Sequence, residues 1–105
     1  MPHVEIKYSA DIEIDVRSLF NQIESAINKL DPSAGVCKSR AYPAVSYKHS
    51  HVMIDIWLLP KPHRNHIFTQ SLLKKLRDCI NEQVANRCYI SVQLYYRDDN
   101  YATIE

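Results

Sequence analysis

The fold is decided by residues 4–30, which read VEIKYSADIEIDVRSLFNQIESAINKL. In residues 4–8 apolar side chains alternate with charged ones, which is typical of a β-strand with one buried face. From Val16 to Leu30 the apolar residues recur at intervals of three and four, which indicates an amphipathic helix. Asp15 directly precedes this pattern and is a favourable N-cap residue. The stretch therefore predicts a strand followed by a helix.

A helix stop and a second strand are expected next. Residues 31–35 read DPSAG, and Gly35, the only glycine in the chain, is expected to adopt a positive φ there. Residues 38–47 form an extended stretch. Because Pro43 has no amide hydrogen to donate to a sheet, this strand is expected at an edge or with a bulge.

The second half of the chain repeats this order. Residues 52–59 are apolar on both faces except at Asp55, as in a central strand. A second amphipathic helix is predicted over residues 67–84, with Asn65 as its candidate N-cap. An alternating pattern over residues 90–96 predicts the last strand.

Two tandem β-α-β units are therefore expected in a single domain, residues 1–105. Right-handed crossovers give an α/β (α+β) fold, a four-stranded sheet with two helices on one face. The other face then lacks cover, and a partly apolar open face is a docking surface. We therefore expect a homo-oligomer. The aromatic residues that exceed what one helix layer can bury are Tyr8, Tyr47, Trp57, Tyr95 and Tyr96.

Composition narrows the function classes. The formal net charge is +1, which gives no electrostatic footprint for nucleic acid or an anionic membrane. With one glycine there is no phosphate-cradling loop. Charges interrupt residues 3–7 where a signal peptide needs an apolar run, and the longest apolar stretch, residues 56–59, is too short to span a bilayer. Three cysteines without a C-x-x-C spacing indicate reduced thiols. We expect a cytoplasmic protein.

Pro2 is the sharpest candidate for chemistry. Methionine aminopeptidase usually removes Met1 before proline, which leaves Pro2 with a free secondary amine. In an apolar pocket near cations, the pKa of this amine falls toward neutrality, where a general base works best. The alternative interpretation is a proline merely tolerated at the start of a strand.

Three cations accompany Pro2 as candidate substrate ligands. Lys38 and Arg40 are two residues apart, so on an extended segment their side chains share a face. Arg64 lies in the loop before the second helix, where a guanidinium can bind a carboxylate through two hydrogen bonds. Taken singly, each cation is also compatible with a solvated surface position.

The histidines offer a rival hypothesis, a metal site. The pairs are His49 with His51 and His63 with His66. No matching carboxylate or thiolate pattern accompanies them, so no metal is predicted. His3 is adjacent to Pro2 but points to the opposite strand face, so direct assistance to the base is not expected.

The sequence resembles the 5-carboxymethyl-2-hydroxymuconate isomerase family of the tautomerase superfamily. The resemblance extends from Met1 to about Tyr96. It rests on Met1-Pro2-His3 followed by a strand, on Leu19-Phe20, on Lys38-Ser39-Arg40 where the family typically has Arg-Ser-Arg, and on the position of Arg64.

The resemblance implies a tautomerase-like homotrimer with active sites near subunit interfaces and no cofactor. Pro2 would be the base that moves a proton in a small unsaturated 2-hydroxy or 2-keto carboxylic acid. Arg64 matches one substrate-binding arginine of the family, and Lys38 aligns with the other, with Arg40 as a stand-in. The alternative is a non-catalytic oligomeric binding protein that keeps the scaffold, since a fold does not fix a function.

Overall fold

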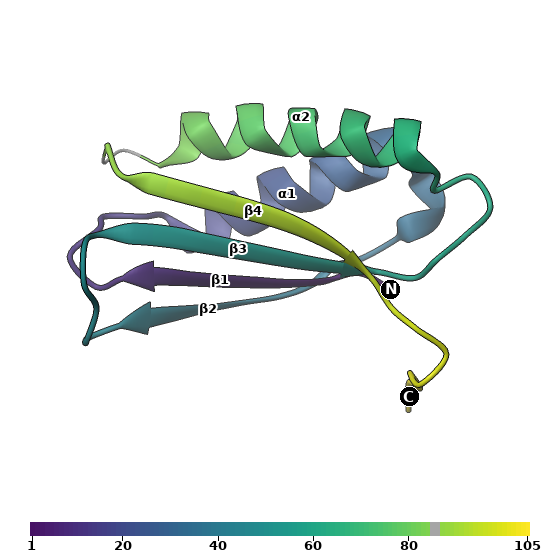
Figure 1. Ribbon diagram of the computed structural model, residues 1–105, viewed down its shortest axis with the longest axis horizontal. Helices are drawn as coiled ribbons and strands as arrows, with labels where there is room; N and C mark the ends of the chain where they lie inside the picture. Colours follow the sequence, from purple (N-terminus) through teal and green to yellow (C-terminus); the bar gives the residue numbers. More distant parts are fainter. Residues whose placement is uncertain (85–86) are drawn as a thin grey trace.

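Two strand–helix–strand units build one sheet with both helices on the same face (Figure 1). The computed structural model describes residues 1–84 and 87–105. The predicted order of elements is confirmed. Its elements are β1 (His3–Ser9), α1 (Val16–Leu30), a short 3-10 turn (Pro32–Ala34), β2 (Lys38–Ala44), β3 (His51–Leu58), α2 (His66–Gln83) and β4 (Tyr89–Tyr96).

The strands lie in the order β2-β1-β3-β4. Pairing is parallel inside each unit, β1 with β2 and β3 with β4, and antiparallel where β1 meets β3. The predicted central position of β3 is confirmed, and Pro43 lies in an edge strand, where a missing amide hydrogen costs the sheet least.

Short polar residues set the ends of the helices. Asp15 accepts a hydrogen bond from the Ser18 amide at 3.1 Å, and Asn65 accepts one from the Phe68 amide at 2.9 Å, so both predicted N-caps are confirmed. Gly35 has φ of 70°, as expected. Of the helices in the described part of the chain, none combines the length and apolar character that a membrane crossing requires.

One predicted boundary is wrong. The second strand ends at Ala44 instead of reaching residue 47. Residues 45–50 form the reversal into β3, in which His49 has a positive φ of 62°. Ala44 pairs with Ser9, the last residue of β1, and β1 is the neighbour of the edge strand β2, so the ladder ends there.

The core lies between the sheet and the two helices. Val4 and Ile6 of β1 and the even-numbered positions of β3 face the helices and are fully buried, as strand periodicity requires. Burial of this apolar surface is the main favourable term in folding. The largest fully buried side chains are Val4, Ile6, Leu19, Ile23, Ile27, Val52, Ile54, Ile56, Leu58, Leu72, Leu76 and Ile80.

The open face of the sheet is less aromatic than the sequence suggested. Tyr8 and Tyr96 occupy even positions and pack against the core, and Tyr47 lies in the turn after β2. Trp57 and Tyr95 do lie on the open face, where their rings stack with centroids 4.9 Å apart.

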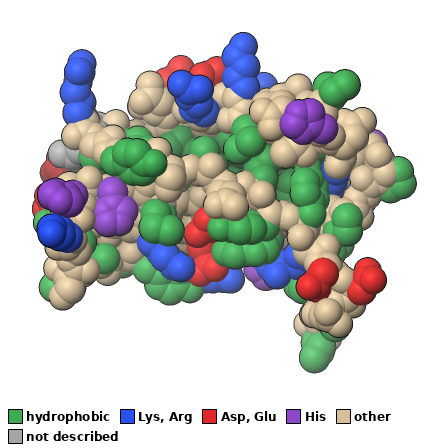
Figure 2. Space-filling model, viewed as in Figure 1, with side chains coloured by type: hydrophobic (Ala, Val, Ile, Leu, Met, Phe, Trp, Pro, Cys, Tyr) green, Lys and Arg blue, Asp and Glu red, His purple; other side chains and the backbone are tan. Residues whose placement is uncertain are grey.

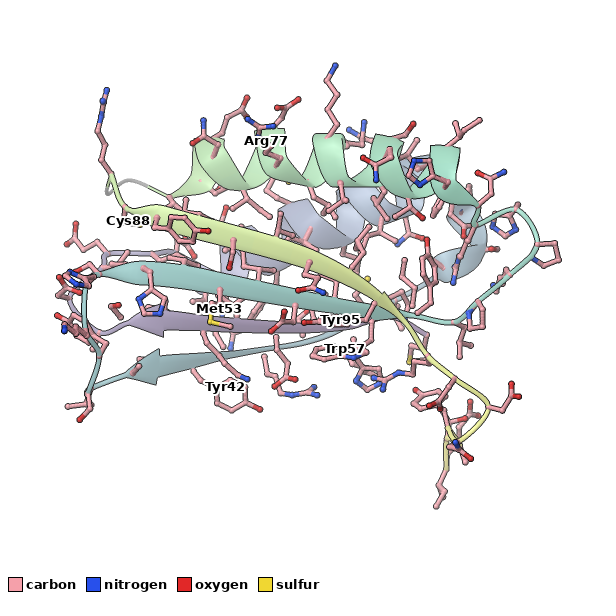
Figure 3. The ribbon with its side chains drawn as sticks, viewed as in Figure 1. Tyr42, Met53, Trp57, Arg77, Cys88 and Tyr95 are labelled. Atoms are coloured by element: carbon pink, nitrogen blue, oxygen red, sulfur yellow. The ribbon has the colours of Figure 1, made fainter. Side chains whose placement is uncertain are left out.

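Charged residues fill much of the remaining open face. Arg40, Glu5 and Asp55 form one row across three strands. Tyr42 and Met53 flank it on the side of the sheet away from the helices (Figure 3). The space-filling view shows hydrophobic side chains next to acidic and basic ones on this side (Figure 2). The face is therefore a mixed surface, with charges that can set register in an interface.

Candidate active site

A cleft of about 1090 Å³ opens at the end of the sheet where β1 begins. Both chain ends lie at this end of the molecule (Figure 1). One side of the cleft is formed by the start of β1 and its neighbours, and the other by the tail after β4. The lining residues are Met1, His3, Lys38, Leu59 and Tyr101–Glu105.

Pro2 is buried at the edge of this cleft, between two residues that line it. Its carbonyl accepts a hydrogen bond from the Lys38 amide at 2.9 Å, which anchors the first residue before β1 to β2. The peptide bond between Met1 and Pro2 therefore lies beside the cleft. The structure brings together Pro2 and Lys38, two of the four residues expected in the site.

Lys38 and Arg40 share the open face of the sheet, as their spacing predicts. Lys38 reaches the cleft. Arg40 lies one pleat further along β2, and its Nε is 3.8 Å from Glu5 Oε2. Since both partners of this pair are partly exposed, the contact adds little to stability and leaves Arg40 able to exchange partners.

Arg64 lies in a different environment from the one the sequence suggested. Its side chain is 3% exposed, and its Nε and Nη2 donate to Asp31 Oδ2 at 2.8 and 2.7 Å. Its Nη1 donates to the Leu59 carbonyl at 2.7 Å. The carboxylate that Arg64 binds in this structure is thus internal. Through Leu59, which lines the cleft, the guanidinium supports one wall of the site.

Asp31 is the centre of this polar cluster. His63 Nε2 lies 2.9 Å from Asp31 Oδ2, and Ser33 donates to the other carboxylate oxygen. Burial alone would raise the pKa of Asp31, but the hydrogen bonds from Ser33, His63 and Arg64, together with the Arg64 charge, hold the pKa well below its usual range. Sequence reasoning took Asp31 only as part of a helix stop, because its partners are about thirty residues away in the chain.

His3 lies on the cleft and was set aside by sequence reasoning. Its side chain does point away from the Pro2 face, as expected. Its Nε2 is 3.4 Å from the Tyr101 hydroxyl, and its Nδ1 is buried with no hydrogen-bond partner among the described residues. Burial, then the nearby positive charges, lower the pKa of His3 and favour the neutral ring. These charges belong to Arg97, Arg40, the N-terminal amine and Lys38.

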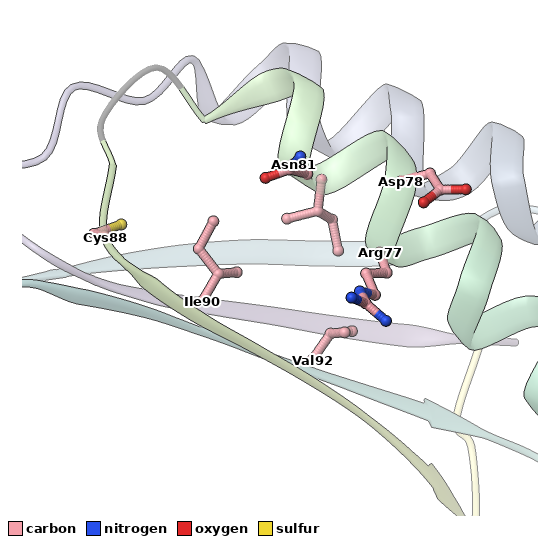
Figure 4. Close-up of a pocket in the computed structure, with 7 residues that line it drawn as sticks. Arg77, Asp78, Asn81, Cys88, Ile90 and Val92 are labelled. Carbon is pink, nitrogen blue, oxygen red and sulfur yellow. The ribbon is translucent and has the colours of Figure 1, made fainter.

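A second, smaller groove of about 380 Å³ lies between α2 and the edge strand β4 (Figure 4). Ile80, Ile90 and Val92 supply apolar surface, and Arg77 and Asp78 are on its rim. The remaining lining residues are Asn81 and Cys88. The groove holds no group of residues with an evident catalytic arrangement.

The three cysteines are free thiols in the structure. Burial raises the pKa of Cys37 to about 12, and burial also raises the pKa of Cys79 and of Cys88. Because the thiolate is the reactive form, these residues are poor nucleophiles at neutral pH.

The histidine pairs are not arranged as metal ligands. His51 Nδ1 contacts the His49 carbonyl at 2.6 Å, and His63 is engaged by Asp31. Within residues 1–84 and 87–105, no three histidine, cysteine or acidic side chains lie together as a metal site would require.

The arrangement of two β-α-β units, with a four-stranded mixed sheet and two helices, is that of the tautomerase fold. Neither the protein-family models nor the curated proteins include a match to this sequence.

Solved structures do match. A 5-carboxymethyl-2-hydroxymuconate delta-isomerase superposes with a TM-score of 0.82 at 16% identity, covering 100% of this chain and 88% of that one. A fused 4-OT, described as a wild-type symmetric trimer, superposes with a TM-score of 0.72 at 11% identity, covering 97% of this chain and 90% of that one. A macrophage migration inhibitory factor-like protein from Entamoeba histolytica superposes with a TM-score of 0.61 at 14% identity, covering 98% of this chain and 95% of that one. The predicted fold is confirmed, and identities this low show the fold alone.

Proposed function

We propose that this chain is a cofactor-independent tautomerase that moves a proton within a small unsaturated 2-hydroxy or 2-keto carboxylic acid. The observation that carries the proposal is the position of Pro2, buried next to a cleft that also holds Met1 and Lys38. Once Met1 is removed, the Pro2 nitrogen would be a secondary amine facing the space that Met1 now fills.

The reaction needs one base and one anion-binding group. Lys38 would pair with the substrate carboxylate, and the neutral Pro2 amine would take a proton from carbon. The electrons of that C–H bond would pass into the conjugated system to give an enolate. The protonated Pro2 would then return the proton to a different carbon, so the amine ends as it began.

The two arginines are given different parts in this proposal. Arg40, paired loosely with Glu5, is the second candidate for a substrate carboxylate. Arg64 would contribute from behind the cleft wall, through its hydrogen bond to the Leu59 carbonyl, unless it exchanges Asp31 for substrate.

We further propose that the working form is a homotrimer that packs its open sheet faces together. Support comes from the exposed apolar groups on that face, Tyr42 and Met53, beside the Trp57–Tyr95 stack. It also comes from the fused 4-OT with the same fold, which is described as a symmetric trimer. Packing of these faces would cover a surface that a monomer leaves open.

One observation favours a second function, that of a non-catalytic oligomeric binding protein. A substrate-binding arginine expected from the resemblance, Arg64, already has a buried internal carboxylate partner. An arginine that is saturated in this way is not free to bind a substrate carboxylate without breaking that pair.

Two measurements separate the functions. The mass of the purified protein shows whether Met1 is absent, and an amide nitrogen at Pro2 would have no basic lone pair. Met-free protein is then mixed with phenylenolpyruvate and with 2-hydroxymuconate, and the ultraviolet absorbance is followed. Turnover that is lost on Pro2→Ala supports the tautomerase. Met-free protein that turns over neither compound would support the binding protein.

A further inference from the structure

A chain of ring and cation contacts crosses the open face beside the cleft. The Arg97 guanidinium carbon lies 4.3 Å from the ring centroid of Tyr101 and 5.7 Å from that of Trp57. Trp57 in turn stacks on Tyr95. Arg97 forms no ion pair with any residue that the structure describes, so these two rings are its main partners. A cation between two aromatic faces is held by their quadrupoles.

Tyr101 is also held from the other side. Its ring meets that of His3 edge-on, at 6.5 Å and 86°, and its hydroxyl is 3.4 Å from His3 Nε2. The Arg97 amide donates to the Leu58 carbonyl at 2.9 Å, which fixes the start of this segment to the end of β3. We name the contacts of Arg97 and His3 with Tyr101 the Tyr101 clamp.

The tail beyond the clamp makes few contacts of its own. Tyr101–Glu105 supply five of the nine residues that line the cleft. Ile104 is 99% exposed, and no hydrogen bond links Ala102–Glu105 to the other described residues. The position of this side of the cleft therefore depends on the Tyr101 clamp.

We propose that Arg97 is a positioning residue that fixes Tyr101, so that the tail forms the outer wall of the cleft and selects acids with a single carboxylate. The inference rests on the proposed function of the same cleft. It assigns roles to Arg97, Tyr101 and the tail, which the sequence pattern had left without one.

The selection follows from the chemistry of the two sides. Lys38 offers one positive charge at the β1 side. Opposite it, Ala102, Thr103 and Ile104 offer no charge, and Glu105 adds a negative one. A carboxylate bound at Lys38 would leave the rest of the molecule against this wall. A second carboxylate there would meet no cation among Ala102–Ile104 and would be repelled by Glu105, whereas an apolar chain or ring would be accepted.

Binding of two inert acids tests the selection without relying on turnover. Cinnamate carries one carboxylate and muconate carries two. Calorimetric titration of the Met-free protein should give a dissociation constant at least about tenfold lower for cinnamate than for muconate. Equal affinities, or tighter muconate binding, would overturn the selection.

A double-mutant cycle tests whether Arg97 acts through the tail. Arg97→Gln and a chain shortened to Tyr101 should each reduce the preference by about tenfold, and their combination should do no more than either alone. Arg97→Lys, which keeps a cation over the rings, should retain part of the preference. Arg77→Gln, on the far groove, is the matched control and should change nothing. Additive effects would assign Arg97 a direct role and remove the positioning role.

Trp57 gives a readout that a merely structural defect would not mimic, because it is the only tryptophan in the chain. Arg97→Gln should shift its emission and speed hydrogen exchange at Ala102–Ile104, while amides of the core strands keep the parent rate. If Arg97→Gln leaves tail exchange unchanged, the clamp is disproved. If Met-free protein does not turn over phenylenolpyruvate but Arg97→Gln still changes Trp57 emission and tail exchange, the tautomerase function is rejected and the Tyr101 clamp is supported.

Discussion

Arg64 and Asp31 form a buried ion pair in which Nε and Nη2 converge on one carboxylate oxygen, at 2.8 and 2.7 Å. The pair joins the residue that ends α1 to the loop that leads into α2. Because Arg64 also holds the Leu59 carbonyl, the same contact connects the helix layer to a wall of the cleft. Arg64, which the sequence suggested as a ligand for the substrate carboxylate, therefore links the two β-α-β units in this structure.

Removal of one partner of this pair should strongly destabilise the fold. Asp31→Ala leaves the Arg64 guanidinium buried without a counter-charge, which costs about 3–5 kcal/mol when a buried pair is broken. Urea unfolding followed by circular dichroism measures the loss. Asp99→Ala, at an exposed acidic position, is the control. A loss as small as that of the control would mean that water reaches Arg64.

Acid should weaken the fold through the same carboxylate. The pKa of Asp31 is lowered in the folded state, so the unfolded chain binds a proton first as pH falls. The contribution of Asp31 is then complete above its unfolded pKa of about 3.9 and is lost progressively below that value. Unfolding free energies of the parent and Asp31→Asn, compared between pH 7 and pH 2, should differ by a constant amount down to about pH 5, and the difference should shrink progressively below about pH 4. A difference as large at pH 2 as at pH 7 would contradict this assignment.

Pro2 should supply the base in Met-free protein. Desolvation and the neighbouring cations are expected to lower the pKa of its amine, and its ring restricts the direction of the lone pair. Pro2→Ala should lose about two decades of kcat/KM, and retention of Met1 should abolish turnover. The pH–rate profiles of parent and variant on phenylenolpyruvate are the measurement. An ascending limb that does not move when Pro2 is replaced would assign the base to another group.

Lys38 should act mainly in substrate binding. A charge-assisted contact contributes about 1.5–3 kcal/mol, so Lys38→Ala should reduce kcat/KM by roughly one to two decades, chiefly through KM. Lys38→Arg keeps the charge and should retain most of the activity. Lys48→Ala, in the exposed turn before β3, is the control. An unchanged KM for Lys38→Ala would move the carboxylate site to Arg40 or Arg64.

The open sheet face should hold the oligomer together. Met53 and Tyr42 are 41% and 45% exposed there, and a carboxylate introduced at Met53 would be buried without a partner in a packed interface. Met53→Asp should therefore shift the sedimentation coefficient from trimer to monomer. Ile67→Asp, at a 77% exposed position on α2, should not. A parent protein that sediments as a monomer at micromolar concentration would reject the trimer itself.

Local patterns carried the fold prediction. The spacing of Val16–Leu30, the caps Asp15 and Asn65 and the position of Pro43 each report a short-range physical preference, and each was confirmed. Tyr8 and Tyr96 were counted among the aromatic residues that one helix layer could not bury, but both pack against the core, on the strand positions that alternate with the open face.

The site was harder to predict, since its contacts are long-range. Arg64 and Asp31 are thirty-three residues apart in the sequence, and Tyr101 and His3 are ninety-eight residues apart. Neither pair has a spacing that a periodic pattern would reveal. Pro2 was singled out because it follows Met1, and Lys38 because it lies two residues before Arg40. Their proximity in the structure follows from the parallel pairing of β1 with β2, which places the starts of these strands side by side.

The hydrogen bond between the Pro2 carbonyl and the Lys38 amide bears on what removal of Met1 would do to the fold. The ladder of β1 begins on an oxygen that belongs to the second residue, and proline has no amide hydrogen to contribute. Cleavage of the bond before Pro2 therefore removes no hydrogen bond from the sheet. Chains with and without Met1 should melt at nearly the same temperature and differ only at the mouth of the cleft. Removal of Met1 would then free the Pro2 amine without changing the stability of the fold. The two forms therefore make a matched pair for any assay of this protein.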